Sequence, residues 1–268
     1  MITCNVMGPS VIDGHYLAGL GNQLFTIATT LALAFENDDV AVFPDLKNKN
    51  WYGNYTENIF RKLYIAGDKN FIQSVHSQDG WKYEKIPYQK NLCLNGYFQS
   101  EKYFKNQRGE ILETFSIPEE INNYIFNKYF NILESENTVA VHVRRGDYLT
   151  KRLRQFHYVQ DVEYYKKAMN LFSDDEKYIF FSDDIEWCKQ NFGSKKNVFF
   201  IEGERDVVDL YLMSMMKNNI IGNSTFSWWG AWLNRSETKR VIAPSKWYGP
   251  KNAHLEVDDL IPDEWQML

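Results

Sequence analysis

The chain has 268 residues, of which 44% are hydrophobic and 16% aromatic, so it can bury a large core in one domain or two. A formal net charge of −5 argues against a general nucleic-acid-binding protein, which needs an excess of Lys and Arg for phosphate contacts. Cys4, Cys93 and Cys188 are widely spaced and form no C-x-x-C pair, so neither a disulfide framework nor a zinc site is indicated.

The N-terminal residues 1–16 hold no Lys or Arg ahead of an apolar stretch and therefore do not resemble a signal peptide. The longest apolar run, residues 24–35, contains three threonines and is about half as long as a membrane span requires. We expect a soluble, cytoplasmic protein with at most a peripheral association with membranes.

The first half of the chain predicts an irregular arrangement of strands and helices. The expected elements are a strand near residue 2, a helix over 22–36, a strand over 40–44 (VAVFP), a strand over 92–97 (LCLNGY), a helix starting near Ser100, and a helix with a polar link over 118–138. Ser100 is a favourable N-cap for the helix that follows it. We place a domain boundary near residue 138.

The second half of the chain predicts a regular alternation of strands and helices. Strands are expected over 139–143 (VAVHV), 178–184 (YIFFSDD), 197–203 (NVFFIEG), 218–223 (NNIIGN) and 240–244 (RVIAP), and helices over 162–172, 185–192, 206–216 and 225–233. Such an alternation is typical of a parallel sheet with crossover helices on both faces. The sequence therefore predicts the α/β class, with a Rossmann-like unit over 139–268.

Two arginines follow the strand VAVHV. In open α/β sheets, ligands bind beyond the carboxyl ends of the strands, so residues in this position are the first candidates for a site. The guanidinium groups of Arg144 and Arg145 suit the oxygens of a diphosphate, and Gly146 allows the backbone to approach closely. Because alternate side chains of a strand point to opposite faces, His142 and Arg144 should share a face and Arg145 should point away from it.

Polar side chains also follow two later strands. Ser182, Asp183 and Asp184 offer carboxylates that can accept hydrogen bonds from a guanine edge or from ribose hydroxyls. The segment GNSTFSWW, residues 222–229, brings hydroxyls and a helix N-terminus that favours an anion. Other interpretations stay open, because an arginine could form an interdomain ion pair and the Asp and Ser-Thr pairs could simply cap helices.

A fourth motif, GLGNQLF, covers residues 19–25 at the start of the first long helix. It lacks the third glycine of the dinucleotide-binding fingerprint, so the G-x-G turn alone is weak evidence for a nucleotide site. Gly21, Asn22 and Gln23 either cap this helix or contact the phosphate or sugar of the ligand from the first half of the chain.

Together these motifs carry a family resemblance. GLGNQLF, GYFQSEKYF (residues 96–104), HVRRGDY (142–148), FSDD (181–184) and NSTFSWW (223–229) occur in the order and spacing of the α-1,2-fucosyltransferases of glycosyltransferase family 11. The resemblance spans almost the whole chain. It implies a GT-B-like fold, in which two Rossmann-like domains face a cleft, with an acceptor-side domain over 1–138 and a GDP-fucose-binding domain over 139–268.

The resemblance also implies an activity, which is the inverting transfer of L-fucose from GDP-β-L-fucose to the 2-hydroxyl of a galactose in a glycan. Arg144 would hold the diphosphate, His142 and Asp183 the guanosine, and Asn22 would reach the ligand from the first domain. The residues expected to act in catalysis are Arg144, Asp147 and Asn22. The residues expected to bind GDP-fucose are Gly21, Asn22, Gln23, His142, Arg144, Arg145, Ser182, Asp183, Asp184, Asn223, Ser224, Thr225, Phe226 and Ser227.

No metal or cofactor is expected. The sequence contains no D-x-D pair, and its five histidines lack the spacing of metal ligands. A general base would help to deprotonate the acceptor hydroxyl, and Asp13, His15 and Asp147 are candidates. Two alternatives remain, a fucosyltransferase with a peptide or lipid-linked acceptor and a binding module without turnover. Neither the natural acceptor nor the oligomeric state follows from the sequence.

Overall fold

The computed structural model describes residues 1–6, 11–12, 15–16, 19–47, 52–65 and 67–268. The chain divides into two compact units, Met1–Pro118 and Glu119–Leu268. The division falls at the start of helix α3 (Glu119–Leu133) rather than after it at residue 138. The reason is that α3 buries Ile121 and Ile125 and packs against α6 (Asp206–Met215) of the second unit.

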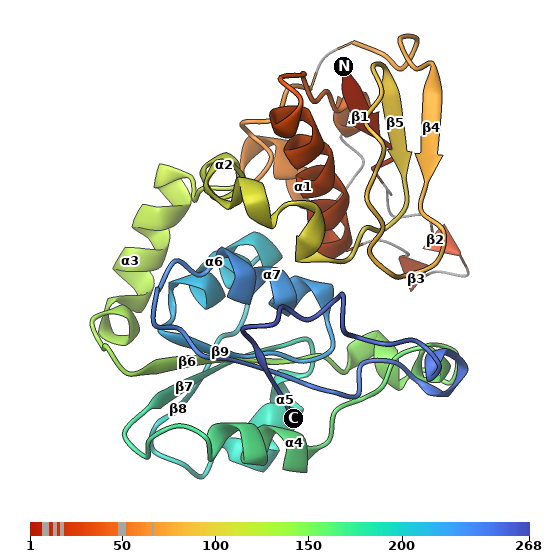
Figure 1. The fold of residues 1–268 in the computed structure, drawn as a ribbon. Coiled ribbons are helices and arrows are strands. Elements are labelled where there is room, and N and C mark those ends of the chain that lie inside the picture. Colours follow the sequence, from red (N-terminus) through yellow and green to blue (C-terminus); the bar gives the residue numbers. More distant parts are fainter. Residues whose placement is uncertain (7–10, 13–14, 17–18, 48–51, 66) are drawn as a thin grey trace. The chain divides into compact units, whose positions relative to one another are not determined.

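The first unit contains a small parallel sheet among its described residues. Its strands lie in the order β1 (Ile2–Cys4), β5 (Leu92–Asn95) and β4 (Ser74–Ser77), as Figure 1 shows. Helix α1 (Leu20–Glu36) packs against β1, and its buried residues include Leu24, Phe25 and Ala28. The unit also contains the antiparallel pair β2 (Val11–Ile12) and β3 (His15–Tyr16), and helix α2 (Arg108–Thr114).

The first unit departs from the sequence prediction in three places. The expected strand over 40–44 is wrong: only a single parallel bridge joins Ala41 to Ile2, and Pro44 then begins a 3₁₀ turn. Strand β4 was not predicted, because its sequence SVHS is largely polar. Ser100 does cap a helix by accepting from the Lys102 N–H at 3.3 Å, but that helix is a single 3₁₀ turn and α2 starts only at Arg108.

The second unit contains a six-stranded, fully parallel sheet. The strand order is β11-β10-β9-β6-β7-β8. The strands are β6 (Thr138–Val143), β7 (Lys177–Ser182), β8 (Val198–Phe200), β9 (Asn218–Ile220), β10 (Val241–Ala243) and β11 (Gln266–Met267). Counted from β6 along the chain, this is the doubly wound order 3-2-1-4-5-6 of Rossmann folds, so the α/β prediction is confirmed.

Helices cover both faces of this sheet, as expected for parallel strands. In Figure 1, α6 and α7 (Thr225–Leu233) lie on one face, and α4 (Val162–Met169) and α5 (Ile185–Phe192) lie on the other. Helix α4 ends at Met169, a few residues before the predicted end at 172. The sheet core is apolar and includes fully buried Val141, Phe180 and Ile220.

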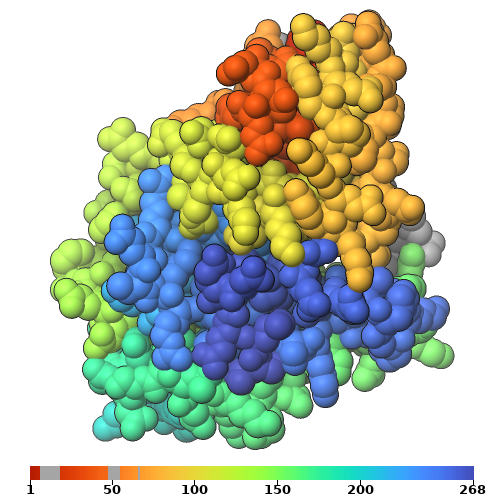
Figure 2. Space-filling view, viewed as in Figure 1, coloured from red at the N-terminus to blue at the C-terminus, as the bar shows by residue number. Residues whose placement is uncertain are grey.

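The end of the chain completes the second unit. Strand β11 adds the sixth strand, and the indole of Trp228 on α7 donates to the Leu260 carbonyl oxygen at 2.8 Å. Trp228, Trp229 and Trp232 lie against one another and are almost completely buried, which matches a core role for large aromatic residues. The terminal residues, in the darkest blue, form much of the surface of this unit that Figure 2 shows.

Candidate functional site

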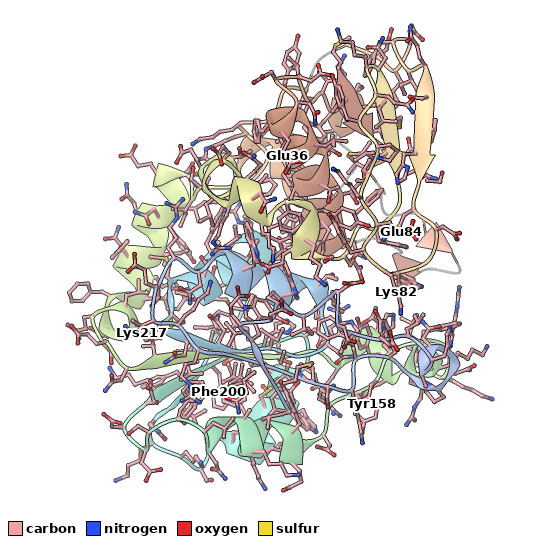
Figure 3. All side chains as sticks on the ribbon, viewed as in Figure 1. Glu36, Lys82, Glu84, Tyr158, Phe200 and Lys217 are labelled. Carbon is pink, nitrogen blue, oxygen red and sulfur yellow. The ribbon has the colours of Figure 1, made fainter. Side chains whose placement is uncertain are left out.

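The candidate site lies at the carboxyl ends of β7, β6 and β9. From β6 the chain runs outward through β7 to β8 and then returns through α6 to β9 on the other side of β6, so the strand order reverses between β6 and β9. Open α/β sheets bind ligands at such a switch point. Figure 3 gives the orientation: Lys217 precedes β9 at one end of the sheet, and Tyr158 lies near the opposite end, where the strands finish.

Arg144 lies directly after β6 and is held by two carboxylates. Its Nη2 donates to Asp147 Oδ1 at 2.7 Å, and its Nη1 lies 3.1 Å from Asp183 Oδ2. The guanidinium carbon lies 5.3 Å from the ring centroid of Tyr148. Burial is the largest single effect on Arg144 and lowers its pKa, but Asp183, Tyr148 and Asp147 together outweigh burial, so the pKa is raised and the group stays a cation.

Arg145 points to different partners from Arg144, as the strand alternation predicts. Its guanidinium stacks on the Trp187 ring of α5 at 4.1 Å, and its Nε donates to Asp184 Oδ2 at 3.1 Å. Asp184 also caps α5 by accepting from the Trp187 N–H at 3.3 Å. The helix-cap interpretation of Asp184 is therefore correct in the structure, and Arg145 is fastened to the same helix.

The motifs after β6 and β7 interlock at Gly146. Asp183 Oδ1 accepts from the Arg145 backbone N–H at 2.8 Å, and its other oxygen contacts Arg144. A Cβ on residue 146 would overlap the Asp183 carboxylate, so only glycine fits without a shift. Ser182 Oγ accepts from the Asp184 backbone N–H at 2.9 Å, which fixes the turn that carries Asp183.

His142 is buried in the last part of β6, at 6% exposure. Its ring centroid lies 5.7 Å from that of Phe226 at the start of α7, and its Nδ1 has no hydrogen-bond partner in the described part of the chain. Burial, with a further contribution from Arg144, lowers the pKa of His142 to about 3, so the imidazole is neutral at physiological pH.

The segment after β9 has a mixed role. Asn223 is buried and donates through Nδ2 to the Tyr158 and Trp247 carbonyl oxygens at 2.6 and 2.9 Å. Ser224 caps α7 by accepting from the Phe226 N–H at 3.3 Å, and Ser227 is completely buried. Thr225 and Phe226 are only half-buried. Of the predicted residues in this segment, Thr225 and Phe226 are thus the ones best exposed to a ligand.

Two aromatic residues were missed as site residues. Tyr148 lies under Arg144, and its ring stacks on His157 with centroids 4.2 Å apart and an interplanar angle of 7°. The Tyr148 hydroxyl donates to the Asn223 carbonyl oxygen at 3.4 Å, which joins the segments after β6 and β9. Burial raises the pKa of Tyr148 to about 12. Tyr148 was visible as the last residue of HVRRGDY, whereas no sequence signal marks His157.

The predicted residues of the first unit lie on α1. Helix α1 begins at Leu20 with Gly19 as its N-cap, so Gly21 and Gln23 are inside the helix and buried. Asn22 is half-buried, and its Oδ1 accepts from Gln99 Nε2 at 2.9 Å. This contact joins GLGNQLF to GYFQSEKYF and leaves the Asn22 amide N–H groups as donors.

The remaining candidates concern a base and a metal. Asp13 lies outside the described residues, and of His15 only the backbone in β3 is described. Asp147, the third candidate base, is engaged by Arg144. Within the described ranges, no group of three His, Cys, Asp or Glu side chains is placed to hold a metal ion, and no helix is long and apolar enough to cross a membrane.

Comparisons with known proteins agree with this architecture. Residues 20–268 match the family model "Glycosyl transferase family 11". The O-antigen biosynthesis glycosyltransferase WbnK of Escherichia coli is 36% identical over 78% of this chain and 70% of its own. An α-1,2-colitosyltransferase of Escherichia coli is 30% identical over 96% of this chain and 98% of its own. The galactoside α-(1,2)-fucosyltransferase 2 of Pongo pygmaeus is 27% identical over 88% of this chain and 74% of its own.

A solved structure shares the fold. The NodZ α-1,6-fucosyltransferase, soaked with GDP-fucose, superimposes with a TM-score of 0.51 at 14% identity, covering 80% of this chain and 89% of that one. The likeness confirms the predicted GT-B-like fold.

Proposed function

The chain belongs to glycosyl transferase family 11, and on this premise we propose that it transfers L-fucose from GDP-β-L-fucose to the 2-hydroxyl of a galactose in a glycan. The observation that carries the proposal is Arg144, a fixed cation at the switch point of a doubly wound sheet. Two relatives, an α-1,2-colitosyltransferase and a galactoside α-(1,2)-fucosyltransferase, favour the α-1,2 linkage.

In the proposed reaction, the galactose O2 attacks fucose C1 from the face opposite the nucleotide. The bond between C1 and the β-phosphate oxygen breaks, the electron pair leaves with GDP, and the acceptor proton goes to a base or to water. A β-linked donor then gives an α-linked product. Negative charge grows on the leaving diphosphate, and the N–H groups of Arg144 are donors for that charge. Helix α7 follows the neighbouring strand β9 and begins at the half-buried Thr225. The backbone N–H groups at its start are further donors for the charge on the diphosphate.

The roles of the other residues follow from their environments. His142 is neutral and its ring lies 5.7 Å from that of Phe226, so it suits contact with the nucleoside rather than with the phosphates. Asn22 of the first unit presents amide donors and is proposed to contact the donor sugar or phosphate.

Because an arginine supplies the cation, we expect turnover within about twofold of normal in excess EDTA. Loss of activity in EDTA that Mg²⁺ or Mn²⁺ restores would contradict this.

The proposal is tested by GDP release with GDP-fucose as donor and a panel of galactosides, including lactose, as acceptors. We expect GDP release that depends on the acceptor and a product whose linkage, by NMR, is α-1,2. A 2-deoxygalactoside is the matched control and should not react. Transfer to that control, or transfer only to peptides or lipid-linked acceptors, would overturn the galactose 2-hydroxyl assignment.

The α-1,2-colitosyltransferase relative, which aligns with nearly the whole chain, makes GDP-colitose a second candidate donor. Colitose differs from fucose by the loss of one hydroxyl, at C3. Competition between GDP-fucose and GDP-colitose in the same assay distinguishes the two donors, and a higher kcat/KM for GDP-colitose would replace fucose in the proposal.

A further inference from the structure

We propose that Asp183 is a positioning residue, which acts with Asp147 to hold the Arg144 guanidinium in the orientation that meets the donor diphosphate. The inference rests on the proposed function and changes one part of it. The family resemblance implies that Asp183 binds the guanosine, whereas the contacts of Asp183 lie with the two arginines.

Both oxygens of the Asp183 carboxylate already contact the segment after β6, one through a hydrogen bond and the other through an ion pair. Oδ1 accepts from the Arg145 backbone N–H at 2.8 Å, and Oδ2 lies 3.1 Å from Arg144 Nη1. A carboxylate that binds a guanine edge accepts from the N1–H with one oxygen and from the amino group with the other, so both oxygens would have to face the base. The absence of a Cβ at Gly146 is what lets the carboxylate reach this position. Asp183 therefore joins two motifs that lie 38 residues apart, and we call the contacts of Asp183 and Asp147 with Arg144 the brace.

Asp147 completes the brace. Its Oδ1 accepts from Arg144 Nη2 at 2.7 Å, so each terminal nitrogen of the guanidinium is held by one carboxylate, and the Tyr148 ring lies along the group at 5.3 Å. An arginine has five N–H donors; Asp147 takes one in a hydrogen bond and Asp183 faces Nη1 as an ion pair, so at least three remain for a ligand. Fixing the fork in advance removes the entropy cost of ordering a long side chain when the diphosphate arrives.

The brace has an electrostatic cost, and that cost makes the inference testable. Two carboxylates beside Arg144 repel a diphosphate. In Asp183→Asn, the removal of one negative charge should therefore offset part of the GDP affinity that is lost when the guanidinium is no longer held in place. Orientation, in contrast, matters most when charge develops on the leaving group. Neutralising Asp183 should therefore lower kcat more than it weakens GDP binding.

The experiment is a double-mutant cycle with Asp183→Asn, which preserves the shape of the side chain, and Arg144→Lys, which preserves the charge but has no fork to orient. In the wild-type background, Asp183→Asn should lower kcat about 10- to 100-fold; in the Arg144→Lys background, it should lower kcat less than about threefold. Calorimetry with GDP and ADP should give an affinity ratio within about twofold of the wild-type ratio.

Two results would overturn the inference. A fall in the GDP-to-ADP affinity ratio in Asp183→Asn would show that Asp183 binds guanine, and equal losses of kcat in both backgrounds would show that it does not act through Arg144. Asp161→Asn is the matched control, because Asp161 caps α4 in the same unit by accepting from the Tyr164 N–H, and its effect should be the same in both backgrounds. Thermal unfolding of each variant checks folding.

The inference and the proposed function fail in different ways. If the wild-type protein binds no GDP, the proposed donor is wrong and the inference falls with it. If the protein binds GDP-fucose but turns over no galactoside, only the acceptor assignment is wrong. The double-mutant cycle is then measured on the hydrolysis of GDP-fucose, in which water replaces the acceptor.

Discussion

The two units place their motif residues by different means. In the second unit, the segments after β6 and β7 are joined by ion pairs, a backbone hydrogen bond and the close approach of Gly146 to Asp183. In the first unit, GLGNQLF and GYFQSEKYF meet through a hydrogen bond between the side-chain amides of Asn22 and Gln99 and through the rings of Phe25 and Phe104, whose centroids lie 6.0 Å apart. The ion pairs fix a permanent charge for an anion, whereas the amide pair only orients a neutral donor.

The cost of a substitution should follow this difference. A residue in the braced cluster has several charged neighbours, so its replacement disturbs the position of Arg144 as well as its own contacts. A residue in the amide pair has one polar partner, so its replacement should lose about one hydrogen bond.

The largest effect is expected at Arg144. Arg144→Lys keeps the charge but loses the planar fork, and we expect kcat to fall by about 10²–10³, with a larger fall for Arg144→Ala. Arg145→Ala is the comparison variant and should be milder, because Arg145 stacks on Trp187 and pairs with Asp184 instead. Steady-state kinetics on folded protein measure all three. Turnover near wild type in both Arg144 variants would remove the central residue of the mechanism.

A smaller effect is expected at Gly146. The methyl group of Gly146→Ala would overlap the Asp183 carboxylate, so either the loop or Asp183 must move, and we expect kcat to fall about 10- to 100-fold. Gly109→Ala in α2 is the control from the other unit, because a Cβ there has nothing within 4 Å. That variant should retain activity. Equal kinetics for the two variants would mean that the close approach at Gly146 is not needed.

Gln99 tests the amide pair of the first unit. Gln99→Ala removes the partner of Asn22 Oδ1, and we expect kcat/KM for GDP-fucose to fall about three- to tenfold, as for one neutral hydrogen bond. Gln99→Glu should also lose activity, because a carboxylate cannot donate to that oxygen. If both variants match the wild type, Asn22 needs no support from Gln99, and the comparison between the units weakens.

The smallest functional effect, with a clear effect on stability, is expected at Asp209 on α6. Unlike Asp183, this half-buried residue has a buried carboxyl oxygen, Oδ1, with no hydrogen-bond partner among the described residues. Burial, with help from Glu204 and Asp206, raises its pKa from 3.8 to about 7. The folded protein therefore binds more protons than the unfolded chain between these values, so this group makes the protein less stable as pH rises from about 4 to about 7.

Asp209→Asn removes that charge. We expect the variant to be more stable than the wild type at pH 8, by about 1–2 kcal/mol or a few degrees in Tm, with the gain vanishing near pH 4. Thermal unfolding at both pH values measures this, and kcat should not change. An equal gain at both pH values would mean that packing, not ionisation, explains the difference.

The accuracy of the sequence prediction also differs between the units. In the second unit, each predicted strand and helix is present, because long periodic segments with clear breaks signal their structure locally. In the first unit, the predicted strand over 40–44 reduces to one bridge at Ala41, and polar β4 was missed. Short strands in irregular units depend on their neighbours more than on their own sequence.

By itself, the sequence determined the alternation of strands and helices, the family, and the presence of Arg144, Asp183 and Ser224 at strand ends, because these are local patterns of residues. Only the tertiary structure decided the partners of each side chain. Asp183 meets the Arg145 backbone across 38 residues, and Gln99 meets Asn22 across 77. The strand order β7-β6-β9 creates the first contact and the packing within the first unit creates the second, and neither long-range arrangement leaves a mark in a local stretch of sequence.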